Sequence, residues 1–228
     1  MLLRQLFDTE SSTYTYLLAD ENSREALFID PVREHIEEYL TLLENSRLTL
    51  KYSLETHVHA DHVTAAGLLR EKTGCQVGLC DKAGILAADL LLKEGDAIIL
   101  GSHKILVLET PGHTPCSACY LAGSNLFTGD TLLINGCGRT DFQGGSAEQL
   151  WHSITQKIFK LPPDTRVYPA HDYHQKEYST IAQEKIHNPR FGSRSREEFI
   201  TLMKDLKLEP PQKIKEAVPA NKKLGLLA

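Results

Sequence analysis

Hydrophobic and polar positions alternate with a period of two in many short stretches of this chain, a pattern typical of strands that bury one face. Three such stretches stand close together near the amino terminus and predict a strand meander. Others end at Pro-Gly, Gly-Asp or Pro-Ala further along the chain. The predicted strands are residues 2–7, 13–18, 26–29, 51–56, 76–80, 97–100, 104–108, 118–121, 125–128 and 166–169.

Apolar residues at helical spacing lie between these strands. Residues 34–43 show this spacing clearly, with Ile36, Tyr39 and Leu43 on one face that should cover a sheet. Strands that alternate with covering helices favour a layered α/β protein. We expect one domain over residues 1–228, with a short C-terminal helical and extended segment from about residue 176. The other predicted helices are residues 64–72, 82–92, 147–159, 176–186 and 196–206, and the proline-containing tail 213–221 is predicted to be extended.

Composition narrows the class of protein. The chain has 228 residues, of which 41% are hydrophobic and 24% are charged, as in ordinary globular proteins. Its 25 basic residues are scattered and outnumbered by 30 acidic ones, which argues against a nucleic-acid-binding surface. No apolar run reaches the roughly 20 residues of a membrane span, and the first residues show no signal-peptide pattern. We therefore expect a cytoplasmic protein, or a mitochondrial matrix protein if a targeting segment has been removed.

The cysteines are consistent with a reducing compartment. Five cysteines are an odd number in a chain without an export signal, which favours free thiols over a disulfide framework. Cys116 and Cys119 have the spacing of a redox pair but stand in strand-like sequence, so we interpret them as hairpin residues. We interpret Cys137 as a small buried thiol.

Potential metal ligands are most concentrated in Thr-His-Val-His-Ala-Asp-His at residues 56–62, directly after a predicted strand. A rigid strand end can hold several ligands convergent, and imidazole nitrogen with carboxylate oxygen suits zinc, iron or manganese. The alternative is a polar loop in which Asp61 and Thr64 only cap the next helix. The potential metal ligands of this stretch are His57, His59, Asp61 and His62.

Three further strand ends carry residues that can bind metals. His113 lies in Pro-Gly-His-Thr-Pro, Asp130 follows Thr-Gly, and His171 follows Pro-Ala. Each of these short sequences alone is more often a turn than a reactive site. Their shared position predicts that they gather along one edge of the sheets, where α/β proteins form active sites.

These four motifs in this order resemble the motif set of the metallo-β-lactamase superfamily, whose fold is a four-layer αββα sandwich with mixed sheets. Within it, the chain is most similar to the persulfide dioxygenases, also called sulfur dioxygenases or ethylmalonic encephalopathy proteins. The closer resemblance spans nearly the whole chain. It includes Ile-Asp-Pro at 29–31, Gly-Cys-Gly-Arg-Thr-Asp-Phe at 136–142, residues 168–174 and Ala-Val-Pro-Ala-Asn at 217–221.

The resemblance implies one non-haem iron(II) per chain, held by His57, His113 and Asp130. Two histidines and one carboxylate on a single face leave three positions open, which is room for a persulfide sulfur and dioxygen. The implied reaction converts glutathione persulfide, dioxygen and water to glutathione and sulfite, a step in sulfide detoxification.

The resemblance also implies roles for the other motif residues. A guanidinium offers a glutathione carboxylate a bidentate partner, so Arg139 would bind substrate together with Tyr173. We also expect a homodimer and a rhodanese-type sulfurtransferase in the same pathway. The residues that would orient the ligands without binding iron are His59, Asp61, His62, His171 and Tyr173.

Two other functions share these motifs. A binuclear thioester hydrolase of the glyoxalase II type would also use His59, Asp61, His62 and His171 as ligands and a metal-bridging hydroxide as nucleophile. Against this alternative, enzymes of the glyoxalase II family carry a larger C-terminal helical region than this chain has. The second alternative is a non-catalytic persulfide-binding module that consumes no oxygen. Metal stoichiometry and oxygen uptake separate the three.

Overall fold

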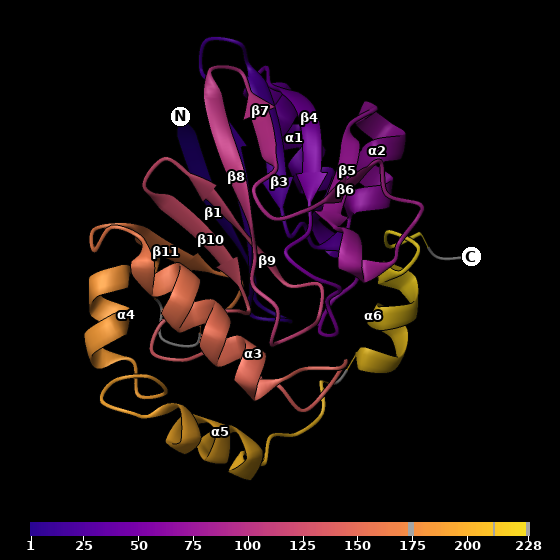
Figure 1. Cartoon of the computed structure of the whole chain (residues 1–228). Helices are drawn as coiled ribbons and strands as arrows, with labels where there is room; N and C mark the ends of the chain where they lie inside the picture. Colours follow the sequence, from indigo (N-terminus) through magenta and orange to yellow (C-terminus); the bar gives the residue numbers. More distant parts are fainter. Residues whose placement is uncertain (173–175, 212, 227–228) are drawn as a thin grey trace.

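Two six-stranded sheets face one another in the computed structural model, which describes residues 1–172, 176–211 and 213–226 (Figure 1). In the first sheet the order along the sheet follows the chain. Its β1 to β3 pair antiparallel, and β3 to β6 pair parallel. The strands are β1 (Leu2–Asp8), β2 (Thr13–Ala19), β3 (Glu25–Ile29), β4 (Thr49–Leu54), β5 (Gln76–Cys80) and β6 (Leu90–Leu92).

The second sheet runs in the order β12-β11-β10-β9-β8-β7, and only β10 and β11 pair parallel. Its strands are β7 (Ala97–Leu100), β8 (His103–Glu109), β9 (Ala118–Ala122), β10 (Asn125–Gly129), β11 (Arg166–Pro169) and β12 (Ser179–Thr180). With helices on both outer faces, these two mixed sheets confirm the predicted four-layer αββα sandwich.

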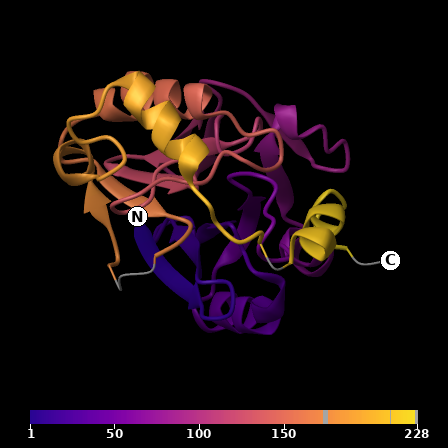
Figure 2. The same ribbon diagram turned by 90° about the horizontal axis from the view of Figure 1, so that it is seen from below.

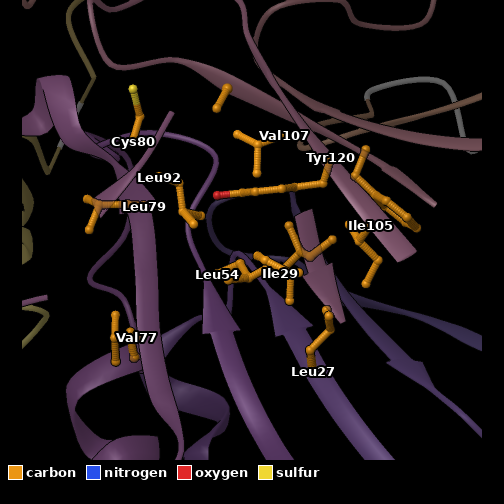
Figure 3. Close-up of a cluster of buried hydrophobic side chains, with 14 of the residues drawn as sticks. Leu27, Ile29, Leu54, Val77, Leu79, Cys80, Leu92, Ile105, Val107 and Tyr120 are labelled. Atoms are coloured by element: carbon orange, nitrogen blue, oxygen red, sulfur yellow. The ribbon is translucent and has the colours of Figure 1, made fainter. Parts of the chain in front are cut away.

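The core between the sheets follows from the alternation along each strand (Figure 3). Leu27 and Ile29 of β3 point toward the second sheet, whereas Phe28 between them packs in the helical layer. Ile105 and Val107 of β8 meet the β3 side chains from the opposite sheet. Because helices cover the outer faces, strands such as β3 are buried on both sides.

Helices form the two outer layers (Figure 2). The first sheet is covered by α1 (Ile36–Asn45), preceded by a 3-10 turn (Arg33–His35), and by α2 (Ala66–Thr73). The second sheet is covered by α3 (Ala147–His152), its π and 3-10 continuations (Ser153–Lys157 and Ile158–Lys160), α4 (Ile181–His187) and α5 (Arg196–Asp205). The last helix, α6 (Ile214–Asn221), lies apart from α5.

Three predicted elements differ from the structure. Residues 82–92 form a 3-10 turn (Asp81–Ala83) and then the edge strand β6, because pairing with β5 outweighs the helical spacing. The helix predicted over 176–186 begins only at Ile181, since Ser179 and Thr180 pair with β11. The tail predicted to be extended contains α6 despite Pro219, because tertiary packing overrides the local cost of proline in a helix.

Two further observations concern the class of protein. Among the described residues, no helix is both long and apolar enough to cross a membrane. The cysteines are buried and free. Cys116 packs in the core between the sheets and Cys119 in the cluster beneath α3. Burial also raises the pKa of Cys119 to about 12, which supports a structural interpretation of this pair.

Asp20 links the two sheets at the end of the sandwich opposite Asp30. Its carboxylate accepts hydrogen bonds from the Ser102 amide (2.8 Å), the Ser102 hydroxyl (2.8 Å) and the Ser23 amide (3.0 Å). These bonds, above all the one from the Ser102 amide, hold the pKa of Asp20 well below its usual range. Its stabilising effect is therefore complete above the unfolded pKa of about 3.9 and decreases as the pH falls toward the folded value.

We expect Asp20→Asn to lower the thermal unfolding midpoint at neutral pH, with a difference from wild type that shrinks below about pH 4. Circular dichroism melts across the pH range would measure both effects. The exposed Asp164→Asn is the matched control. An equal shift for both variants at neutral pH would contradict the role given to Asp20.

Candidate metal centre

The predicted ligands meet at one edge of the sandwich. The 56–62 stretch follows β4, His113 lies in the loop between β8 and β9, and Asp130 follows β10. One nitrogen each of His57 and His113 and one carboxylate oxygen of Asp130 lie within 4.8 Å of one another. Bonds of roughly 2.0–2.2 Å allow two ligands of one ion to stand at most about 4.4 Å apart. A small contraction would therefore let this set hold one ion.

Hydrogen bonds orient His57 for metal binding. The Thr56 hydroxyl donates to Asp30 Oδ2 at 2.8 Å, and the same hydroxyl oxygen lies 3.0 Å from His57 Nδ1. Because the hydroxyl proton is already used, His57 Nδ1 must donate to it, which leaves the lone pair on Nε2. Burial lowers the pKa of His57 well below its usual range, so the ring is neutral, as a metal ligand must be.

His113 and Asp130 complete the set. His113 Nδ1 donates to the Arg139 carbonyl oxygen at 2.8 Å, so its Nε2 carries the lone pair. That Nε2 lies 3.4 Å from Asp130 Oδ2, while Asp130 Oδ1 is buried without a hydrogen-bond partner in the described chain. The lone pair of His113 Nε2 therefore faces the Asp130 carboxylate, and Asp130 Oδ1 lacks a hydrogen bond among the described residues. This arrangement is unfavourable unless a cation lies between the nitrogen and the carboxylate. The three residues therefore fit a divalent metal ion.

His59, Asp61 and His62 form a second group of atoms within 4.8 Å of one another. His62 Nδ1 donates to Asp61 Oδ2 at 2.9 Å, and His62 Nε2 is buried without a hydrogen-bond partner in the described residues. His59 Nε2 contacts Asp30 Oδ1 at 3.0 Å and Glu55 Oε2 at 3.3 Å. This geometry suits either a second ion or groups that orient the first site, so the non-ligating role stays a prediction.

His171 stands between the two groups. Its Nδ1 donates to the Ser12 carbonyl oxygen at 3.0 Å, and its Nε2 lies 3.5 Å from Asp130 Oδ1 and 3.6 Å from Asp61 Oδ2. Burial opposes the charged ring, but the Asp130 and Asp61 carboxylates raise the pKa of His171. The other predicted neighbour, Tyr173, lies outside the described residues.

Sequence reasoning missed two acidic residues behind the ligands. Asp30 adopts a left-handed backbone (φ 52°) at the end of β3 and accepts the Thr56 amide at 2.7 Å. Glu55 accepts the Thr64 hydroxyl at 2.5 Å, and burial raises its pKa. The position of Asp30 in Ile-Asp-Pro at the end of a predicted strand could have indicated its role. No comparable sequence feature marks Glu55.

A cavity of about 500 Å³ opens beside the ligands. His113, Asp130 and Asp61 line one side, and apolar side chains such as Phe142 and Leu208 line another. A volume of this size is typical of small-molecule sites. An ion on His113 and Asp130 would therefore face a space that admits a ligand.

Arg139, the predicted substrate residue, lines this cavity but is already paired. Its guanidinium donates to both oxygens of Asp141 at 2.7 Å and to the carbonyl oxygens of Leu208 (3.0 Å) and Glu209 (2.6 Å). It also lies 4.4 Å from the centroid of the Phe142 ring. Arg139 thus joins the loop of residues 136–142 to residues 208–209, and its substrate role stays a prediction.

Arg190 is a second arginine on the cavity wall and was missed by the sequence analysis. It is partly buried, and its side chain has no hydrogen bond or ion pair among the described residues. Asn188, two residues before it, is firmly held, because its side-chain Nδ2 donates to the Gly136 carbonyl oxygen at 2.9 Å and to the Glu184 carboxylate at 2.8 Å. Within the part of the chain that the structure describes, Arg190 therefore presents its positive charge to the cavity without a bonded partner.

The comparisons with known proteins agree with this geometry. The family model of the metallo-beta-lactamase superfamily matches residues 8–171. The mitochondrial persulfide dioxygenase ETHE1 of Mus musculus is 48% identical, and that of Homo sapiens 47%, each match covering 99% of this chain and 89% of the relative. The crystal structure of ETHE1 from Myxococcus xanthus is 50% identical, with a TM-score of 0.97 over 99% of this chain and 100% of that one. The chain therefore belongs to the metallo-beta-lactamase superfamily and, within it, to the persulfide dioxygenase ETHE1 family.

Proposed function

We propose that the chain oxidises glutathione persulfide with dioxygen and water, giving glutathione and sulfite. The balanced reaction is GSSH + O2 + H2O → GSH + H2SO3. The observation that carries the proposal is that His113 and Asp130 both belong to the ligand cluster and line the 500 Å³ cavity. Membership of the persulfide dioxygenase family supplies the reaction class.

We assign the metal to one iron(II) per chain on His57, His113 and Asp130. When bound there, iron would supply adjacent open positions for a persulfide sulfur and dioxygen and a path for electrons between them. His57 and His113 are fixed in the tautomer that presents Nε2. Asp61, on the cavity wall, can accept a hydrogen bond from the water consumed in the reaction.

The cavity wall supplies substrate contacts of two kinds. Phe142 and Leu208 would offer apolar surface to the persulfide end of the substrate. This apolar surface would reduce the contact of the persulfide sulfur with bulk water. A glutathione carboxylate would bind Arg190, whose guanidinium has no bonded partner among the described residues, and Arg139 would hold residues 208–209 of the cavity wall in place. Tyr173 stays a proposed substrate contact from the family resemblance alone.

We expect Arg190→Gln to raise the KM for glutathione persulfide about 10- to 100-fold, because a hydrogen bond to a charged group contributes about 1.5–3 kcal/mol. Steady-state oxygen uptake measures KM and kcat, and kcat should change little. The exposed Arg196→Gln is the matched control. An unchanged KM in Arg190→Gln would show that a residue other than Arg190 binds the carboxylate.

We expect Arg139→Ala to keep its iron and to weaken substrate use, because residues 208–209 lose their hydrogen bonds to the guanidinium.

The test of the function uses anaerobically iron-loaded protein mixed with glutathione persulfide. We expect oxygen uptake with stoichiometric sulfite from protein that holds about one iron per chain. Absence of uptake by loaded protein would reject the dioxygenase. Two metal ions per chain with thioester hydrolysis would favour the glyoxalase II-type alternative, which the full-length relatives support less well.

The remaining proposals concern the setting of the reaction. We propose that residues 1–228 act as one domain, since α3 and α5 share a cluster with β10 and β11. Free thiols favour a reducing compartment, the cytoplasm or the mitochondrial matrix. A homodimer is testable by size-exclusion chromatography with light scattering. A rhodanese-type sulfurtransferase partner is testable by a coupled assay that follows its use of sulfite.

A further inference from the structure

Asn221, the last residue of α6, directs its side chain to the backbone of the ligand loop, residues 56–64, which carries the ligand His57 and the second group His59, Asp61 and His62. Its Nδ2 donates to the carbonyl oxygens of His59 at 2.9 Å and His62 at 2.8 Å. Its Oδ1 accepts the Thr64 amide at 2.9 Å. The residue is only 4% exposed, so both N–H groups and the oxygen of one buried amide serve a single loop.

The described residues provide no other hydrogen bond to these three backbone groups. Without Asn221, two carbonyl oxygens and one amide would be buried and unpaired, which is costly. The loop would then move to regain partners. Because Asp61 lies between His59 and His62, such a movement would displace it from its contacts with the ligand clusters.

The surrounding contacts fix Asn221 with respect to the loop. Ala217 and Ala220 of α6 pack against Val63 within the loop itself. After the helix, the Leu224 carbonyl accepts the Gly67 amide of α2 at 2.8 Å. Gly225 has a left-handed backbone (φ 74°), and a Cβ there would collide with the Thr64 carbonyl oxygen. Residues 217–225 therefore pack closely against the ligand loop and hold Asn221 in place beside it.

We propose that Asn221 is a positioning residue of the metal centre, which fixes the ligand loop so that the bound ion is retained. The inference rests on the metal centre of the proposed function but not on the reaction. Asn221 does not line the cavity, so its effect should appear in metal retention and kcat, and KM should stay unchanged.

The test compares Asn221→Ala with wild type and with Lys222→Ala, an exposed neighbour. Each protein is loaded anaerobically with iron(II), and release to a chelator is followed at a temperature where circular dichroism shows full folding. We expect release at least about 10-fold faster from Asn221→Ala, the size of effect typical of groups that orient metal ligands. The d–d absorption of cobalt(II)-substituted protein should also shift in Asn221→Ala but not in Lys222→Ala.

Release at the wild-type rate with an unchanged cobalt spectrum would overturn the inference. If Asn221→Ala does not fold, Asn221→Ser replaces it, because its short hydroxyl cannot reach both carbonyls yet keeps a small polar side chain at this site. The same rate criterion then applies. Wild-type protein that retains iron but consumes no oxygen would reject the proposed function and leave this inference standing.

Discussion

Replacing Asp130 with alanine is expected to remove the metal and reduce oxygen uptake more than about 100-fold. Even groups that only orient ligands typically contribute 10- to 100-fold to metal affinity, and Asp130 is a ligand itself. Its carboxylate faces the lone pair of His113 at 3.4 Å and stands 3.5 Å from His171.

Metal analysis of the purified variant, together with oxygen electrode assays, measures the effect. The metal-free form of Asp130→Ala should keep the circular dichroism spectrum of metal-free wild type, because Asp130 Oδ1 makes no hydrogen bond among the described residues that the fold depends on. This outcome separates metal loss from misfolding. Asp164→Ala, at an exposed site, is the control. Wild-type metal content in Asp130→Ala would contradict the assignment of Asp130 as a ligand.

The second large effect is expected for Gly138→Ala. A Cβ at Gly138 would stand 2.8 Å from His113 Nδ1 and still closer to the Asp130 carbonyl oxygen. Real side chains essentially never approach so closely, and one of the two contacts is with rigid backbone. The methyl group would push His113 away from the Arg139 carbonyl and out of its ligand orientation. We expect metal affinity to fall about 100-fold or more.

The same loop offers a matched control. At Gly136 a Cβ would meet only Leu133 Cβ, at an ordinary 3.8 Å. Gly136→Ala should therefore keep wild-type metal affinity. Competition with a colourimetric chelator gives the affinity of both variants. Equal affinities for Gly138→Ala and Gly136→Ala would show that the loop relaxes without disturbing His113.

The sequence analysis was most reliable where the physical signal is local. Alternating apolar residues predicted the strands, because burial of one face repeats every second residue. The ligand types stood at strand ends in sequence, and the structure brings His57, His113 and Asp130 together there. Residues 82–92 failed because their apolar run fits a helix and a strand equally well. Only pairing with β5 decides between them.

The sequence by itself therefore determined the layered fold, the ligand types and the family resemblance. Tertiary structure alone decided which nitrogen of His57 and His113 faces the ion, since that choice depends on Thr56 and on the distant Arg139 carbonyl. It also decided that Arg139 is paired with Asp141 while Arg190 has no bonded partner among the residues that the structure describes, and that Asn221 bonds the His59 carbonyl from 162 positions away. The physical reason is that these hydrogen bonds join segments far apart in the chain, and the local pattern of apolar and polar residues does not indicate which distant segments come into contact.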